Sequence, residues 1–103
     1  MIARIWQGCT RPGMGKAYMP YLVQTGLKEY RETKGFHDML VLTREIEDTT
    51  EYLLITLWED MEAVRRFAGP EPDKAVYYPE DARYFPENEC TPYVRHYEVH
   101  ETD

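Results

Sequence analysis

The chain has 103 residues, of which 43% are hydrophobic and 30% are charged. This length suits one globular unit, so we expect residues 1–103 to form a single domain. No apolar run approaches the roughly 18 residues that a membrane-spanning helix requires. The first ten residues also lack the basic start and the continuous apolar segment of a secretory signal. The sequence therefore predicts a cytoplasmic protein without a membrane partner.

Charge and cysteine content exclude further classes of function. Twelve Lys and Arg against nineteen Asp and Glu give a net charge of -7, which repels a phosphate backbone, so nucleic acid is not an expected partner. The two cysteines, Cys9 and Cys90, lie far apart, without a C-x-x-C motif or a Cys/His pair at zinc spacing. We expect no metal site, and we interpret both thiols as small buried hydrophobes.

The first half of the chain predicts a strand followed by an interrupted helix. Residues 2–7 are rich in β-branched and aromatic side chains and precede a turn around Pro12 and Gly13. From about Lys16 to residue 34, apolar residues recur at helical spacing, and Gly35 is a typical stop. Pro20 and Gly26 fall inside this stretch, so we expect a late start or a bend at the first and a break at the second.

Two further strands follow. Residues 36–46 and 51–58 flank the polar tetrad 47–50, a pattern that predicts an antiparallel hairpin. Their centres, residues 39–42 and 52–57, are apolar at nearly every position, which indicates that both faces of the sheet are covered. Helices of the same chain can cover one face only. The other face therefore predicts an obligate homodimer.

The last third of the chain completes the fold. Asp60 is a plausible N-cap for a short helix that ends at Gly69. The proline-rich segment 70–92 permits only short helical pieces, which we place at 73–78 and 80–85, and residues 93–99 alternate as a last strand. The order β-α-β-β-α-β predicts an α+β, ferredoxin-like fold with an antiparallel sheet.

Several segments resemble one family in the right order. They are residues 1–8 (MIARIWQG), 25–31 (TGLKEYR), 57–60 (LWED) with 67–69 (FAG), and 75–81 (AVYYPED). They resemble the antibiotic biosynthesis monooxygenase family over nearly the whole chain. The resemblance implies a dimeric α/β barrel, in which two four-stranded sheets pack face to face and each subunit keeps its own pocket between sheet and helices. It also implies oxygenation without a bound metal or flavin, in which an electron-rich phenol is deprotonated and reacts with dioxygen.

A related branch of that family binds and degrades haem, using a strand Asn, a Trp and a haem-ligating His. Trp58 matches the family Trp, but Gln7 stands where the Asn is expected, and residues 73–85 contain no His. The resemblance therefore favours a cofactor-independent reaction over haem degradation.

Four residues are candidates for substrate binding. Trp58 is either a pocket wall that stacks on a flat substrate or a core residue beneath the second helix, and for Trp6 the core interpretation is stronger. Gln7 takes the place of the family Asn. Tyr77 precedes Tyr78 and Pro79, where irregular backbone can bring phenols to a cavity rim.

Two residues are candidates for proton transfer. His96 lies inside the last strand and is the best available proton carrier, because imidazole titrates near neutrality; it is equally interpretable as a strand residue at a dimer interface. Tyr78 is the second catalytic candidate, although most tyrosines are packing residues.

Two hypotheses for function follow. The first is a cofactor-independent monooxygenase of a small aromatic or polyketide-like compound. The alternative is a non-catalytic, dimeric small-molecule-binding or interaction protein of the same fold, because acid-base groups are sparse.

Overall fold

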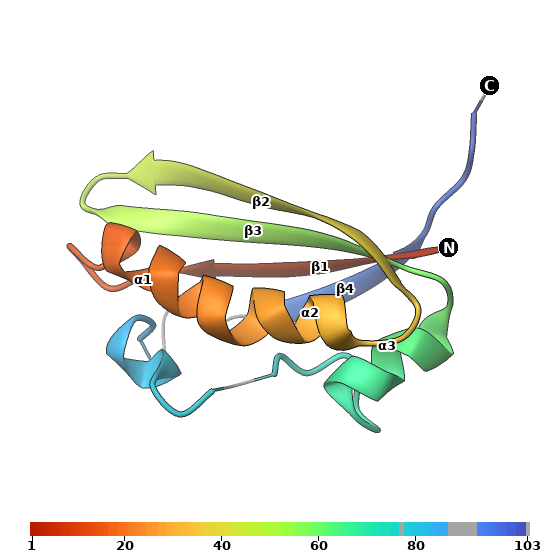
Figure 1. The fold of residues 1–103 in the computed structure, drawn as a ribbon. Coiled ribbons are helices and arrows are strands. Elements are labelled where there is room, and N and C mark those ends of the chain that lie inside the picture. The colour runs from red at the N-terminus through yellow and green to blue at the C-terminus, as the bar shows by residue number, and fades with distance from the viewer. Residues whose placement is uncertain (77, 87–92, 103) are drawn as a thin grey trace.

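The computed structural model describes residues 1–76, 78–86 and 93–102. Four antiparallel strands form one sheet in the order β2-β3-β1-β4, and the helices lie on one side of it (Figure 1). The elements are β1 (Ile2–Cys9), α1 (Gly15–Leu22), the π-helical turn η1 (Val23–Leu27), α2 (Lys28–Glu32), β2 (Phe36–Ile46), β3 (Thr49–Trp58), α3 (Met61–Ala68), the 3-10 turn η2 (Asp81–Arg83) and β4 (Tyr93–Glu98). This order confirms the predicted α+β, ferredoxin-like fold.

Strand alternation gives the sheet an inner face toward the helices and an outer face away from them. On the central strand β1, Arg4 and Trp6 are buried on the inner face, whereas the intervening Ile5 points outward and is half-buried. β3 alternates in the same way along its whole length. The buried core is thus a layer between the inner face and the helices. Its members are Trp6, Tyr18, Leu22, Leu27, Tyr30, Tyr52, Leu54, Trp58, Ala63, Val64, Tyr84, Phe85 and Val94.

The outer face carries apolar side chains in contact with solvent. Leu40 is 57% exposed, Leu42 is 43% exposed and Tyr97 is 50% exposed. Strand register places Leu40 beside Ile55 and Leu42 beside Leu53. Among the described residues, no helix is long and apolar enough to cross a membrane.

The long helical segment differs from the prediction. The structure continues from α1 through η1 into α2, with Pro20 inside α1 and Gly26 inside the π-helical turn, so the expected break at Gly26 was wrong. The interruption is a change of hydrogen-bond register, which a π-helical turn accommodates without ending the helix. Within it, the Thr25 hydroxyl donates to the Tyr21 carbonyl at 2.8 Å. Burial of Leu22, Gly26 and Tyr30 on one face holds the segment against the sheet.

Two shorter elements also refine the prediction. The hairpin turn is Glu47 and Asp48 alone, because strand pairing extends to Ile46 and Thr49; Glu47 takes a positive φ of 58°. The predicted N-cap is confirmed, since the Asp60 carboxylate accepts the Ala63 N–H at 2.9 Å.

The segment after α3 is less helical than expected. Residues 73–76 are turn or irregular, so no helix begins at 73, and within the predicted piece 80–85 only η2 is helical. Pro79 and Pro86 limit the two predicted pieces, because each proline disfavours helical backbone at the residue before it, here Tyr78 and Phe85. Tyr77 lies outside the described residues.

Candidate functional site

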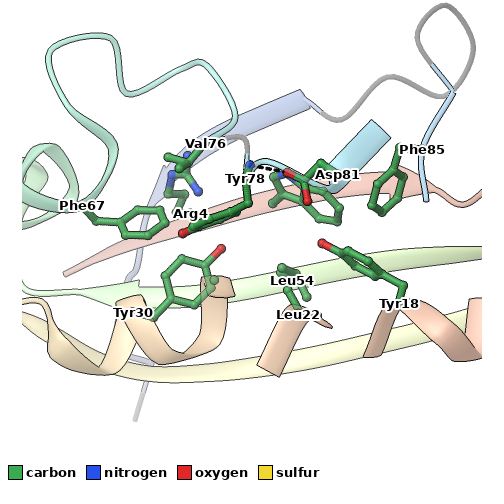
Figure 2. Close-up of a pocket in the computed structure, with 12 residues that line it drawn as sticks. Arg4, Tyr18, Leu22, Tyr30, Leu54, Phe67, Val76, Tyr78, Asp81 and Phe85 are labelled. Carbon is green, nitrogen blue, oxygen red and sulfur yellow. Dashed lines mark hydrogen bonds between the residues drawn. The ribbon is translucent and has the colours of Figure 1, made fainter. Parts of the chain in front are cut away.

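A cavity lies between the inner face of the sheet and the helical layer (Figure 2). Its free volume is about 20 Å³, close to the space that one water molecule needs. Side chains from β1, β3, the helical segment, α3, and η2 with the loop residues on either side of it enclose the cavity. They are Arg4, Trp6, Tyr18, Leu22, Gly26, Tyr30, Leu54, Phe67, Val76, Tyr78, Asp81 and Phe85.

Arg4 is the cation of this cavity. It is 1% exposed, and β1 holds its backbone between β3 and β4. Its Nη2 donates to the Lys74 carbonyl at 3.3 Å, and its guanidinium carbon lies 5.4 Å from the centre of the Phe67 ring. Its Nε is buried without a hydrogen-bond partner among the described residues. Burial lowers the pKa of Arg4, but a guanidinium remains charged at neutral pH.

Three phenols line the same space. Tyr18 and Tyr30 are 4% and 3% exposed, and burial raises the pKa of both, with the Arg4 charge opposing that rise for Tyr30. Burial also raises the pKa of Tyr78, and its hydrogen bond to the Glu29 carboxylate adds to that rise. The Tyr78 hydroxyl donates to Glu29 Oε2 at 2.6 Å. All three phenols therefore remain protonated at neutral pH, so each has a hydroxyl proton to donate to a ligand.

Asp81 is the carboxylate of the cavity wall. Its Oδ2 accepts the Tyr78 N–H at 2.7 Å, which fixes the carboxylate at the start of η2. Burial raises the pKa of Asp81, and the bond from the Tyr78 N–H partly offsets that rise. A carboxylate with a raised pKa is a better proton acceptor than an ordinary surface carboxylate.

His96 lies beside Arg4 on the neighbouring strand. The two residues are direct partners in the β1–β4 register, so their side chains share the inner face. His96 Nδ1 is 3.2 Å from Asp73 Oδ1, and its Nε2 is buried without a partner among the described residues. Burial lowers the pKa of His96, the Arg4 charge lowers it further, and the contact with Asp73 opposes both. If Nδ1 carries the proton that Asp73 accepts, neutral His96 presents a lone pair at Nε2.

The candidate site residues predicted from the sequence do not all lie at this cavity. Trp6 and Tyr78 line the cavity, whereas His96 lies next to Arg4 and is not part of the lining. Gln7 alternates with Trp6 and therefore points to the outer face. Trp58 is fully buried at 0% exposure and does not line this cavity. Tyr77 lies outside the described residues, so its role stays a prediction.

The environment of Trp58 is that of a core side chain. Its ring contacts those of Tyr30, Phe36 and Phe67, and its indole N–H donates to the Thr56 hydroxyl at 2.8 Å. Every polar atom of the indole is thus satisfied within the protein. The structure places Trp58 behind the cavity wall, where it supports Tyr30 and Phe67.

Sequence reasoning missed several of the polar residues at this site. Arg4 stands two positions before Trp6, and this spacing puts both on one face of a strand. This two-residue spacing was the available signal, because a charged residue on the core face of a central strand is rare without a partner. Tyr30 and Asp81 gave no comparable signal, because one resembles a packing residue and the other a helix cap.

Comparison with known proteins supports the fold. No protein-family model matches the chain, and no curated protein matches it. Solved structures do match, and two of them are similar over 99% of the chain. One is a candidate antibiotic biosynthesis monooxygenase from Bacillus cereus, with 16% identity, 93% of that chain covered and a TM-score of 0.62. The other is a monooxygenase from the ActVA-Orf6 gene of Streptomyces coelicolor in complex with the ligand nanaomycin D, with 17% identity, 89% covered and a TM-score of 0.63.

These matches show the fold of the chain. At such identities the likeness extends to backbone architecture, and the chain has the fold of the antibiotic biosynthesis monooxygenases. The resemblance predicted from the sequence is confirmed at that level.

Proposed function

We propose that this protein is a cofactor-independent monooxygenase that acts on a small aromatic or polyketide-like phenol. One observation carries the proposal: an aromatic cavity between sheet and helices contains the buried cation Arg4, with the carboxylate of Asp81 in its wall. Such a cavity suits a flat substrate that loses a proton and then carries negative charge. The shared fold with two structures described as monooxygenases is consistent with this reaction.

The reaction is an oxidation by dioxygen, written here for an anthrone-type substrate. Removal of one proton from the ring CH2 gives a carbanion whose charge is delocalised onto oxygen. The anion passes one electron to dioxygen, and the resulting radical and superoxide combine to form a C–O bond. The peroxide takes up the proton, and loss of the second hydrogen with cleavage of the O–O bond gives a carbonyl and one water. Each CH2 and O2 thus become C=O and H2O, so no other reductant is required.

Each polar residue has a proposed role in this sequence. Arg4 stabilises the delocalised anion, because its charge is fixed in a water-poor site. Asp81 accepts the first proton and returns it to the peroxide. His96, oriented by Asp73, is a second proton carrier beside Arg4. Tyr78 closes the cavity and donates a hydrogen bond.

Substrate entry requires movement of the loop before and within η2. Ligand pockets usually measure roughly 300–1,000 Å³, far above the free volume found here. Tyr78 and Asp81 belong to this loop, whereas Arg4 and Trp6 belong to the central strand. The loop is fastened by hydrogen bonds such as those from Tyr78 to Glu29 and from the Glu80 N–H to the Tyr21 hydroxyl, at 3.0 Å. We propose that it opens as a lid.

The outer face of the sheet supports a homodimer. Exposed Leu40, Leu42 and Tyr97 lie on the face that the helices leave uncovered. We propose that a second copy packs there, face to face, burying on the order of 2,000 Å² as obligate dimers do. This arrangement leaves one cavity per subunit, on the opposite side of each sheet.

Oxygen uptake tests the proposed function directly. The protein is incubated with a panel of anthrone-like phenols, with anaerobic and protein-free controls. We expect oxygen consumption above the uncatalysed rate for at least one compound, with Asp81→Asn reducing it roughly 100-fold, within the range for loss of a general base. Asp48→Asn, in the distant hairpin turn, is the matched control and retains activity. The absence of oxygen consumption above the uncatalysed rate with every compound overturns the proposal. If some of these compounds nevertheless bind, the result favours the non-catalytic binding protein.

A further inference from the structure

We propose that the cavity selects ligands with a single anionic oxygen on a flat aromatic ring, and that the Arg4 guanidinium binds this oxygen. The oxygen is that of a phenolate, or one of the two oxygens that share the charge of a carboxylate. This inference rests on the proposed function, which makes the cavity the ligand site. It adds the charge and the shape of the ligand.

The first argument is the missing partner of a buried cation. Removing a charge from water costs several kcal/mol unless it is paired, and an arginine cannot avoid this cost by losing its proton. Among the described residues, Arg4 forms no ion pair; it has one long hydrogen bond to a carbonyl, the Phe67 ring and an interaction with Tyr30. Asp73 attracts the guanidinium only from beyond ion-pair distance, and its side chain is exposed to solvent. No buried carboxylate therefore pairs with Arg4 in the described structure. An anion that enters the cavity supplies the counterion.

The nearby carboxylates are occupied elsewhere. Asp73 contacts His96 and its side chain is 88% exposed to solvent. Glu29 accepts the Tyr78 hydroxyl, and Asp81 accepts the Tyr78 N–H. None of the three forms an ion pair with Arg4 in the described structure, so an anionic ligand has no internal carboxylate to displace.

The second argument is rigidity. Arg4 pairs with Thr56 on one side and His96 on the other, and its carbonyl accepts the Thr56 hydroxyl at 3.3 Å. The backbone that carries the guanidinium is therefore fixed in the central strand, and the guanidinium itself contacts the Lys74 carbonyl and the Phe67 ring. A preorganised donor of this kind loses little freedom when an anion binds, which favours binding.

The lining residues define the rest of the ligand. Trp6 and Phe67 offer aromatic surfaces, and Tyr30 offers a protonated phenol beside the Arg4 guanidinium. A second anionic group would meet the Asp81 carboxylate, which belongs to the same lining (Figure 2). The site thus fits a planar monoanion better than a dianion or a neutral ring.

Binding of matched probes tests this inference independently of turnover. Isothermal titration compares 2-naphthoate with 2-naphthamide, and 2-hydroxy-1,4-naphthoquinone, which is ionised at pH 7, with its methyl ether. We expect at least one anion to bind roughly tenfold or more tightly than its neutral partner, with the two pairs distinguishing carboxylate from phenolate. Equal affinity within both pairs, or no measurable binding of any probe, overturns the inference.

Variants then assign the preference to Arg4. Arg4→Met should weaken the preferred anion roughly 10- to 100-fold and leave the neutral partner unchanged, because only the charge contact is lost. Arg4→Lys should retain part of the preference. Arg65→Met removes the same charge from an exposed position of α3 and is the matched control, with binding unchanged. If Arg4→Met fails to fold, the comparison of Arg4→Lys with the wild type tests the role of Arg4. An Arg4→Lys protein with the wild-type preference for the anion and the wild-type affinity for it overturns that role.

The two proposals fail separately. Charge-selective binding that depends on Arg4, without oxygen uptake, supports this inference and contradicts the monooxygenase. Oxygen uptake that is unaffected by Arg4→Met, without any preference for anions, supports the monooxygenase and contradicts this inference.

Discussion

Substitution of Gly15 by alanine tests how the helical layer is seated on the sheet. Gly15 is the first residue of α1 and is buried against β3. A Cβ at this position would overlap with Thr50 Oγ1 and would lie 2.7 Å from Thr50 Cβ. The hydroxyl can rotate away only by giving up its 2.8 Å hydrogen bond to Glu45. The Cβ of Thr50 is fixed to the strand, so the helix must move.

The expected loss of stability is the sum of three effects. Overpacking costs about 1–3 kcal/mol. A shift of α1 also stretches the 2.6 Å hydrogen bond from the Tyr52 hydroxyl to the Gly15 carbonyl, and a buried bond that is lost costs about 1–3 kcal/mol. Alanine returns up to about 1 kcal/mol through its higher helix propensity. Taking the middle of each range, we expect a net loss of about 3 kcal/mol, or a Tm lower by roughly 10–25 °C for a domain of this size.

Urea denaturation followed by circular dichroism measures this loss, at one protein concentration because dimerisation would contribute to stability. Gly13→Ala is the control: no atom lies within 4 Å of its added Cβ, but its φ of 74° makes alanine mildly strained. We expect a loss of about 1 kcal/mol there. A Gly15→Ala protein as stable as Gly13→Ala would refute the reasoning, because the close approach to Thr50 would then have no energetic consequence.

Three further predictions concern the helix cap, the buried histidine and the outer face. Asp60→Ala should destabilise the protein by about 1 kcal/mol in the same denaturation assay, because α3 loses its N-cap acceptor; an unchanged midpoint contradicts this. Because the pKa of His96 is lowered on folding, the unfolded chain binds more protons below about pH 6.5. The stability of the wild type relative to His96→Gln should therefore be constant above that pH and decrease as the pH falls toward the folded pKa; a difference independent of pH from 4 to 8 speaks against it. Leu53→Asp should dissociate or unfold the proposed dimer in light scattering, whereas Val23→Asp on the exposed helical side should not; an intact, folded Leu53→Asp dimer would rule out this interface.

The strands could be predicted from the sequence because their signal is local. Residues 36–46 match β2 at both ends, since β-branched and apolar side chains run between a glycine stop and an acidic turn. The helical segment was harder to predict. Local rules treat Pro20 and Gly26 as breaks, but burial of Leu22 and Tyr30 against the sheet stabilises a continuous segment with one π-helical turn. Tertiary packing thus outweighed local propensity.

The candidate site was predicted only in part, because a cavity joins residues that are distant along the chain. Trp6 and Tyr78 were identified through their segments, but the contact between Tyr78 and Glu29 spans 49 positions and has no local signature. Arg4 was missed because a single charge in a short strand resembles a surface residue until the neighbouring strands fix which face is buried. The role assigned to Trp58 rested on the resemblance, whereas its burial depends on side chains from three other elements.

Different parts of the cavity determine how tightly a ligand binds and how fast it enters. The charge that would hold a ligand belongs to a residue of β1, whose backbone is paired along both edges and stays in place when the loop moves. The groups that close the cavity lie on the loop around η2, whose attachments include single hydrogen bonds such as that of Tyr78. Loosening the loop should therefore change the rates of ligand entry and exit together, while the preference for an anion remains with Arg4. Tyr78→Phe, which removes one attachment and keeps the ring, should accelerate both rates in stopped-flow binding and leave the ratio of anion to neutral affinity unchanged. A change in that ratio would mean that the loop, rather than the strand, sets the specificity.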